Sequence, residues 1–148
     1  YYDSKDALLF DLLDTKLSAL LSRIQNVDVS GLSAREALEK TITETLMAYE
    51  GEDYEHQVQN TQLGLLPGEQ QKTLREYQKL MVRRMSELLS AAAPGVFEND
   101  KSKLRATTMS IFGMLNWFYM WQPQATPDDR RDYARLVTNL TLNGCSAI

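Results

Sequence analysis

Residue types that commonly perform catalysis are sparse in this chain. Among 148 residues, His56 is the only histidine and Cys145 the only cysteine, which excludes a histidine-rich metal site, a second histidine base and an internal disulfide. The carboxylates show no metal-ligand spacing, and neither a GxSxG motif nor a phosphate-binding loop occurs. We therefore expect no enzyme, no metal site and no cofactor, and we expect His56, within the polar stretch DYEHQVQN, to be solvated.

Two polar side chains stand in apolar surroundings and point to a different kind of site. Arg84 shares a helical face with Tyr77 and Met81 at spacings of three and four, so its charge needs an anionic partner, an anionic ligand or an exit to solvent. Asn116 has aromatic neighbours, and a buried amide needs hydrogen-bond partners. A salt bridge and a structural hydrogen bond are the alternatives to ligand binding for these two residues.

An apolar interior with a few polar groups is typical of a ligand cavity. We expect one inside each subunit, enclosed by the second helix, the LGLLP segment, and the fourth and fifth helices. The predicted lining residues are Leu66, Tyr77, Met81, Arg84, Phe112, Asn116 and Tyr119, with Arg84 near a polar mouth.

The elements that would position these residues are all helices. Between a few breaks rich in Gly and Pro, the apolar spacing is three and four residues almost throughout, and no two-residue alternation stands out. The sequence predicts an all-α bundle of about six helices. Their approximate ranges are 4–25, 33–47, 53–61, 67–92, 100–121 and 127–143. SARE at 33–36 is a capping box, Thr126 with Pro127 is a strong helix start, and Gly144 can close the last helix.

The fifth predicted helix is apolar on every side, as MSIFGMLNWFYMWQ shows. A helix of this kind must be buried all round, and five other helices can cover only part of it, so we predict a homodimer in which the fifth and last helices form a four-helix bundle across a two-fold axis. A purely intramolecular core helix is the alternative. The predicted interface residues are Met109, Gly113, Trp117, Met120, Tyr133, Leu136, Val137 and Leu140.

Composition limits the partners of the chain. The formal net charge is −4, which gives no overall attraction for nucleic acid. No apolar run approaches the ~20 residues needed to span a bilayer, so no membrane partner is expected. A single cysteine suits the reducing cytoplasm.

The first residues, YYDSKDALL, resemble a distinctive stretch of the tetracycline-repressor (TetR) family of bacterial transcription regulators. In that family the recognition helix of a helix-turn-helix domain ends in an aromatic-rich run followed by Phe, a variable residue, Ser-Lys-Glu, another variable residue and Leu. Ser4, Lys5 and Leu8 match this pattern, Tyr2 stands where Phe is usual, and Asp6 replaces Glu. Farther on, FGMLNWFYMWQP and LNG look like the effector domains of one branch of the family, several members of which respond to acyl-coenzyme A thioesters.

This resemblance implies a division of labour along the chain. Residues 1–3 would be the remnant of a DNA-binding domain that is otherwise missing from this sequence, and residues 4–148 a ligand-binding and dimerisation domain. Tyr1 and Lys5 would contact the phosphate backbone of operator DNA in the intact protein, and a small-molecule effector such as an acyl-coenzyme A would release a repressor from DNA. A helical protein–protein dimerisation module without any ligand is the alternative function.

Overall fold

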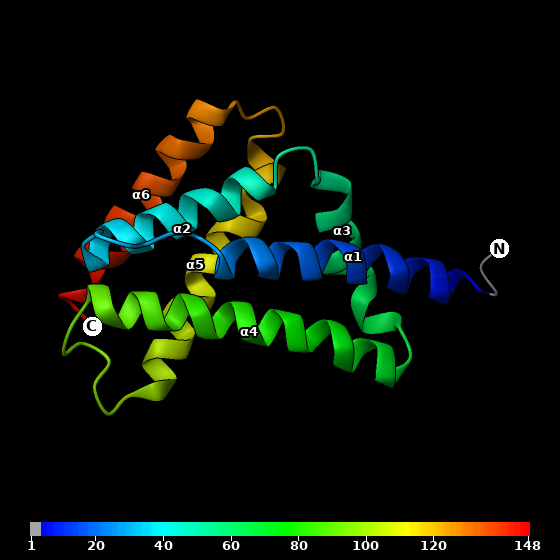
Figure 1. The fold of residues 1–148 in the computed structure, drawn as a ribbon, viewed down its shortest axis with the longest axis horizontal. Coiled ribbons are helices and arrows are strands. Elements are labelled where there is room, and N and C mark those ends of the chain that lie inside the picture. Colours follow the sequence, from blue (N-terminus) through cyan, green and yellow to red (C-terminus); the bar gives the residue numbers. More distant parts are fainter. Residues whose placement is uncertain (1–3) are drawn as a thin grey trace.

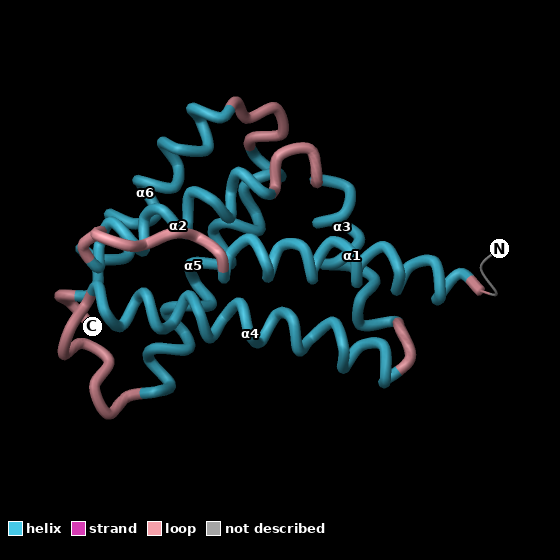
Figure 2. The backbone as a smooth tube through the Cα atoms, viewed as in Figure 1, coloured by secondary structure: helices cyan, strands magenta, loops and turns pink. Residues whose placement is uncertain are grey.

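The structure, a computed structural model, describes residues 4–148, and over that range it contains α-helices and one short 3₁₀ helix but no strand (Figures 1 and 2). The predicted all-α fold of six helices is confirmed. The elements in chain order are α1 (Lys5–Gln25), α2 (Ala34–Ala48), α3 (Asp53–Gln62), the 3₁₀ helix η1 (Leu63–Leu65), α4 (Gly68–Ala92), α5 (Lys101–Trp121) and α6 (Pro127–Cys145).

Local capping chemistry explains where several helices begin. The Ser4 hydroxyl accepts a hydrogen bond from the Ala7 backbone N–H at 3.0 Å, which satisfies one of the free donors at the start of α1. Ser33 with Glu36 forms the predicted capping box of α2. A second capping box, in which Thr126 pairs with Asp129, starts α6.

The end of α6 differs from the prediction, because Gly144 lies inside the helix and the last helical residue is Cys145. Cys145 is buried at 4% exposure. Burial of this side chain favours two more helical residues over a glycine-closed end, because the free energy of packing outweighs the low helix propensity of glycine.

The core lies where α2 packs between α4 and α6, with α1 lying along α4 (Figure 1). Leu38, Ile42 and Leu46 of α2 are all 0% exposed, and their spacing of four residues places them on one face of the helix. By contrast, α3 makes its main contacts only with α1 and η1. Thus α2 is held on several sides, and α3 is a lightly packed element beside α1.

The helix α5 is buried on one side only. Ile111, Leu115 and Phe118 face the core at 0–2% exposure, whereas Trp117 on the opposite side is 58% exposed. In its contacts within the subunit, α5 packs mainly on α4 and α6. The expectation that neighbouring helices cover only part of α5 therefore agrees with the packing of the single chain. No helix in residues 4–148 is long and apolar enough to cross a membrane.

Candidate functional site: a cavity beside α1

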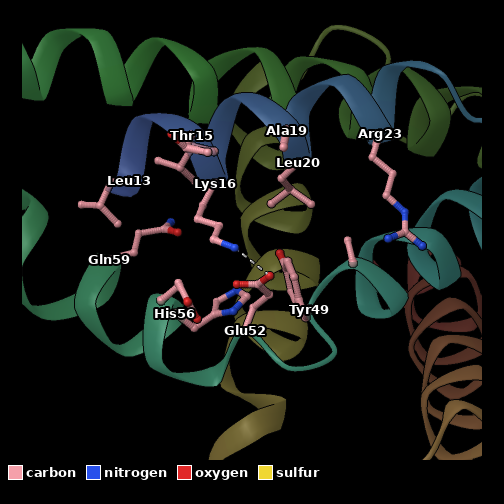
Figure 3. Close-up of a pocket in the computed structure, with 13 residues that line it drawn as sticks. Leu13, Thr15, Lys16, Ala19, Leu20, Arg23, Tyr49, Glu52, His56 and Gln59 are labelled. Carbon is pink, nitrogen blue, oxygen red and sulfur yellow. Dashed lines mark hydrogen bonds and ion pairs between the residues drawn. The ribbon is translucent and has the colours of Figure 1, made fainter. Parts of the chain in front are cut away.

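A cavity of about 280 Å³ lies between α1, the end of α2 and the start of α3 (Figure 3). Its walls combine leucine side chains with several ionisable groups. The lining residues are Leu13, Thr15, Lys16, Leu17, Ala19, Leu20, Arg23, Ala48, Tyr49, Glu52, Glu55, His56 and Gln59.

Helical spacing and one turn bring these side chains together. On α1, Leu13, Leu17 and Leu20 recur every three or four residues and so share the face toward the cavity. The chain then reverses between α2 and α3 through Gly51, whose φ of 77° lies in the left-handed region that glycine adopts without steric cost. This reversal places Glu52 opposite α1.

An ion pair spans the cavity from α1 to the start of α3. The Lys16 Nζ donates to Glu52 Oε1 at 3.0 Å, and this hydrogen bond, followed by the negative charges of Glu52 and Glu55, raises the pKa of Lys16. The other carboxylate oxygen, Glu52 Oε2, is buried without a hydrogen-bond partner in the described part of the chain. The site thus contains one satisfied and one unsatisfied acceptor on the same side chain.

His56 lies at the base of the cavity and is only 7% exposed, so the prediction that it is solvated is wrong. Its ring packs edge-on against Tyr49, with centroids 4.0 Å apart, and lies 6.0 Å from the Tyr119 ring. Burial lowers the pKa of His56, because a low-dielectric environment disfavours the imidazolium form. His56 is therefore a neutral, aromatic part of the wall at pH 7.

The signal that could have revealed His56 is its helical register. Glu52, His56, Gln59 and Leu63 follow one another at spacings of four, three and four, which places them on one side of α3. Leu63 is 3% exposed and marks this side as the inward one. The polar composition of DYEHQVQN obscured this pattern.

Two residues predicted to bind a ligand form a layer behind the cavity. Asn116 Oδ1 accepts a hydrogen bond of 2.8 Å from the hydroxyl of Tyr49, and Tyr119 stands behind His56. Burial raises the pKa of the Tyr49 phenol, so Tyr49 remains a neutral donor to Asn116. The proposed structural hydrogen bond of Asn116 is therefore present.

The other five predicted ligand residues lie away from this cavity. Leu66, Met81 and Phe112 are buried in the core at 3–7% exposure. The Tyr77 hydroxyl donates to Asp14 Oδ1 at 2.7 Å, and Arg84 Nη1 lies 3.6 Å from Glu87 Oε2 on the same helix. Arg84 thus has the salt bridge that was the alternative to an anionic ligand. None of the seven residues lines the cavity beside α1, and their direct contact with a ligand stays a prediction.

A second candidate site is the outer face of α5 and α6, where apolar side chains gather on the surface. On α5, a Cβ added at Gly113 would meet no atom within 4 Å, so this part of the helix is open to approach. We call this surface the α5–α6 face. Its large exposed side chains, each 44–58% accessible, are Met109, Trp117, Met120, Trp121, Leu136 and Leu140.

Two of the predicted interface residues, Val137 and Tyr133, are not exposed on the α5–α6 face. Val137 is 0% exposed and belongs to the core of the subunit, because it falls on the inner side of α6 beside Ala134 and Thr138. Tyr133 is half-buried, with its ring stacked on Phe118 at 4.5 Å. Conversely, Trp121 was not predicted as a member of this face, although its position four residues after Trp117 was a usable signal.

The predicted DNA-backbone residues lie at the start of the chain. Tyr1 is outside the described residues, as is the predicted domain remnant 1–3. Lys5 is the first residue of α1 and is exposed. Across residues 4–148, no group of three or more His, Cys, Asp or Glu side chains could hold a metal ion.

Comparison with known proteins agrees with this architecture. The family model described as "Tetracyclin repressor-like, C-terminal domain" matches residues 31–145. The chain therefore belongs to the TetR family, as a C-terminal domain of this kind. Because TetR-family proteins are transcription regulators, its role is regulatory and not catalytic.

Several solved structures are similar to the chain, and two of them are bacterial regulators of the TetR family. A TetR-family transcriptional regulator from Bordetella parapertussis 12822 is 28% identical, with a TM-score of 0.85 over all of this chain and 77% of that one. A bacterial regulatory protein of the tetR family from Rhodococcus RHA1 is 19% identical, with a TM-score of 0.78 over 96% of this chain and 74% of that one. The second similarity supports the fold alone. No curated protein matches the chain significantly.

Proposed function

We propose that this chain is the effector-sensing and dimer-forming part of a cytoplasmic transcriptional repressor, with a helix-turn-helix domain preceding it in the intact protein. Family membership supports the regulatory role. The resemblance of SKDALL to the junction that follows a TetR recognition helix supports the position of the DNA-binding domain. In that arrangement Tyr1 and Lys5 would position the protein on phosphates without reading sequence.

The observation that carries this proposal is the location of the cavity against α1. Residues of α1 from Leu13 to Arg23 form an entire wall of the cavity, so any occupant touches the helix that would lead to the DNA-binding domain. An effector acts on DNA affinity only through different affinities for two poses of the protein. A ligand against α1 can supply that difference directly.

Dimerisation through a four-helix bundle completes the proposal. The α5–α6 face exposes large apolar side chains from two adjacent helices, and large exposed apolar patches mark interaction surfaces. A second copy of the chain, related by a two-fold axis, offers the same face and would bury it. The dimer would set the separation of two DNA-binding domains. A dimerisation module without any effector is less well supported, because it leaves the cavity without a role.

The acyl-coenzyme A effector implied by the sequence resemblance stays a prediction. The cavity, at about 280 Å³, is slightly smaller than the usual range of ligand sites, roughly 300–1,000 Å³. Of the charged wall residues, Lys16 is paired with Glu52 and Arg23 with Glu44, so Glu55 adds a negative charge that would repel phosphate groups. These features favour a smaller effector than a coenzyme A thioester.

A chimeric regulator tests the proposal. The DNA-binding domain of a TetR-family protein with a known operator would be fused N-terminally to Ser4, and operator affinity measured by fluorescence anisotropy. Ala19→Trp, at the cavity wall, should change operator affinity about five- to 150-fold, the usual range of allosteric coupling. Ala91→Trp, at an exposed alanine on α4 outside the cavity, should leave it unchanged. Equal affinities for both variants and the parent chimera would refute a role of the cavity in DNA release.

A further inference from the structure

The Oε2 oxygen of Glu52 is an acceptor for which the cavity walls supply no hydrogen-bond donor. Glu52 Oε1 is paired with Lys16, whereas Oε2 is buried and has no partner within residues 4–148. A buried acceptor without a donor carries the full cost of its desolvation, and the cost is larger for a charged group. Because Oε2 has almost no accessible surface, a ligand reaches it only when the Glu52 side chain turns. A ligand that then brings a hydrogen-bond donor to this carboxylate removes the cost, whereas a ligand with only acceptors does not.

The charges around the cavity favour a cationic donor. The charge of Arg23 is paired with that of Glu44, because Arg23 Nη2 lies 3.2 Å from Glu44 Oε2. Lys16 is paired with Glu52, which leaves Glu55 as an additional negative charge close enough to raise the pKa of Lys16. An anionic ligand would face these carboxylates, while a protonated amine would be attracted to them.

The remaining walls suit an apolar body. Leu13 and Leu17 are 1–2% exposed and form part of the α1 wall with Leu20, and the Tyr49 and His56 rings close the far side (Figure 3). Each buried methylene of a ligand would contribute through the hydrophobic effect. Aromatic faces near the amine add a favourable cation–π attraction.

We propose that this cavity recognises apolar amines, with the protonated amine donating to the Glu52 carboxylate and the hydrocarbon packing on Leu13, Leu17 and Leu20. The inference rests on the proposed effector role of the cavity and names the class of its ligand. The amine competes with Lys16 for the same carboxylate. Occupancy therefore weakens the ionic link between α1 and the start of α3.

The test uses four probes with the same hydrocarbon chain, namely octylamine, octyltrimethylammonium, octanol and octanoate. Because His56 is the only histidine and lines the cavity, the NMR signals of its ring report occupancy without ambiguity. Octylamine should bind saturably and shift these signals, at least about tenfold more tightly than octanol, since a charged hydrogen bond adds to the same apolar contact. Octyltrimethylammonium, which has charge but no N–H donor, should bind more weakly than octylamine, and octanoate should bind most weakly of all.

Three substitutions test whether the amine binds to Glu52. Glu52→Gln should lower octylamine affinity about ten- to a hundredfold and leave octanol affinity within about threefold. Glu50→Gln is the matched control, because Glu50 is an exposed acid close by in sequence that does not line the cavity, and it should change neither affinity. Lys16→Met removes the competing cation and should strengthen octylamine binding.

Four outcomes would overturn the inference. Equal binding of all four probes would leave an apolar effector cavity, as the proposed function requires, but would remove the amine preference. Octanoate binding as tightly as octylamine, or octylamine binding that survives Glu52→Gln unchanged, would assign recognition to another group. If no probe moves the His56 signals, both the amine preference and the effector role of this cavity fail, whereas the dimerisation proposal is unaffected.

Discussion

The cavity beside α1 and the α5–α6 face are both open to solvent, but they differ in what they can bind. The cavity mixes leucine walls with an ion pair and an unsatisfied carboxylate oxygen. The α5–α6 face presents tryptophan, methionine and leucine side chains over two helices. Hydrogen bonds are directional and select one ligand geometry, whereas the hydrophobic effect is non-directional and scales with area.

This difference indicates separate roles for the two regions. The α5–α6 face is suited to a large, matching apolar surface, for which a second copy of the chain is the simplest source. The cavity is suited to a small molecule with a specific polar group. The α3 helix beside it is lightly packed, and lightly packed elements can move at low free-energy cost. The α5–α6 face would therefore mediate dimerisation, and the cavity would bind the effector to which the protein responds.

The largest expected effect is on assembly. Trp117→Glu should raise the dimer dissociation constant at least about thirtyfold, because buried interface aromatics are often worth 2 kcal/mol or more. Tyr54→Glu is the control, since Tyr54 is an aromatic residue on α3 that is 67% exposed and lies outside the α5–α6 face. Analytical ultracentrifugation of both variants measures the constants. A wild-type chain that sediments as a monomer at micromolar concentration would contradict the assignment of dimerisation to the α5–α6 face.

A smaller effect on assembly should follow from Gly113→Leu. The new side chain meets nothing within its own subunit near the Cβ, and removing a mid-helix glycine should favour helix by roughly 1 kcal/mol. At a close helix–helix contact between subunits, the same side chain would be overpacked at a cost of about 1–3 kcal/mol. We expect a dimer weakened roughly tenfold with no loss of helicity by circular dichroism. Unchanged assembly would mean that Gly113 lies outside the interface.

The burial of His56 at the cavity should make the stability of the folded chain depend on pH. Burial lowers the pKa of His56 below its ordinary value of 6.5, so just below pH 6.5 the unfolded chain binds more protons at this residue than the folded one. The His56 contribution to stability is then present above pH 6.5 and decreases as the pH falls toward the folded pKa.

Urea denaturation between about pH 7.5 and 5.5 measures this effect. The midpoint of the wild-type chain should fall over this range, and His56→Phe, which keeps an aromatic ring but cannot titrate, should remove that part of the decrease. Carboxylates such as Glu36, whose pKa is lowered mainly by its hydrogen bond to the Ser33 backbone, titrate at lower pH. A titration midpoint for His56 above 6.5 by NMR would show that the ring is not buried as described.

The smallest effect should come from the ion pair across the cavity. Both side chains of the pair are partly exposed, Lys16 at 40% and Glu52 at 31%, and ion pairs that solvent reaches typically contribute about 0–1 kcal/mol. Lys16→Met should therefore change the free energy of unfolding by less than about 1 kcal/mol while still altering amine binding. A loss of several kcal/mol in urea denaturation would make the pair a structural support and not a ligand-responsive link.

Sequence reasoning predicted the helices well, because their signals are local. The capping residues Ser4, Ser33 and Thr126 all act within three residues of themselves, so the sequence alone contains the interaction. The outward positions of Met109, Trp117 and Leu140 were also predictable, since helical periodicity separates the two sides of each helix. Val137 was misplaced because its side of α6 is chosen by contact with α2, which is distant in the chain.

The cavity was less predictable, because its residues come from three segments whose relative positions depend on packing. Arg84 stands on an apolar stripe, but only the fold shows that Glu87 neutralises it on its own helix. His56 lies in a polar stretch, but only the packing of α3 beside α1 turns it inward between Tyr49 and Tyr119. The all-helical class, the helix starts and the apolar α5 follow from local patterns, because periodicity and capping act over a few residues. The location of the cavity and the burial of the Glu52 Oε2 oxygen follow only from the packing of the helices, because burial depends on contacts between segments far apart in the chain.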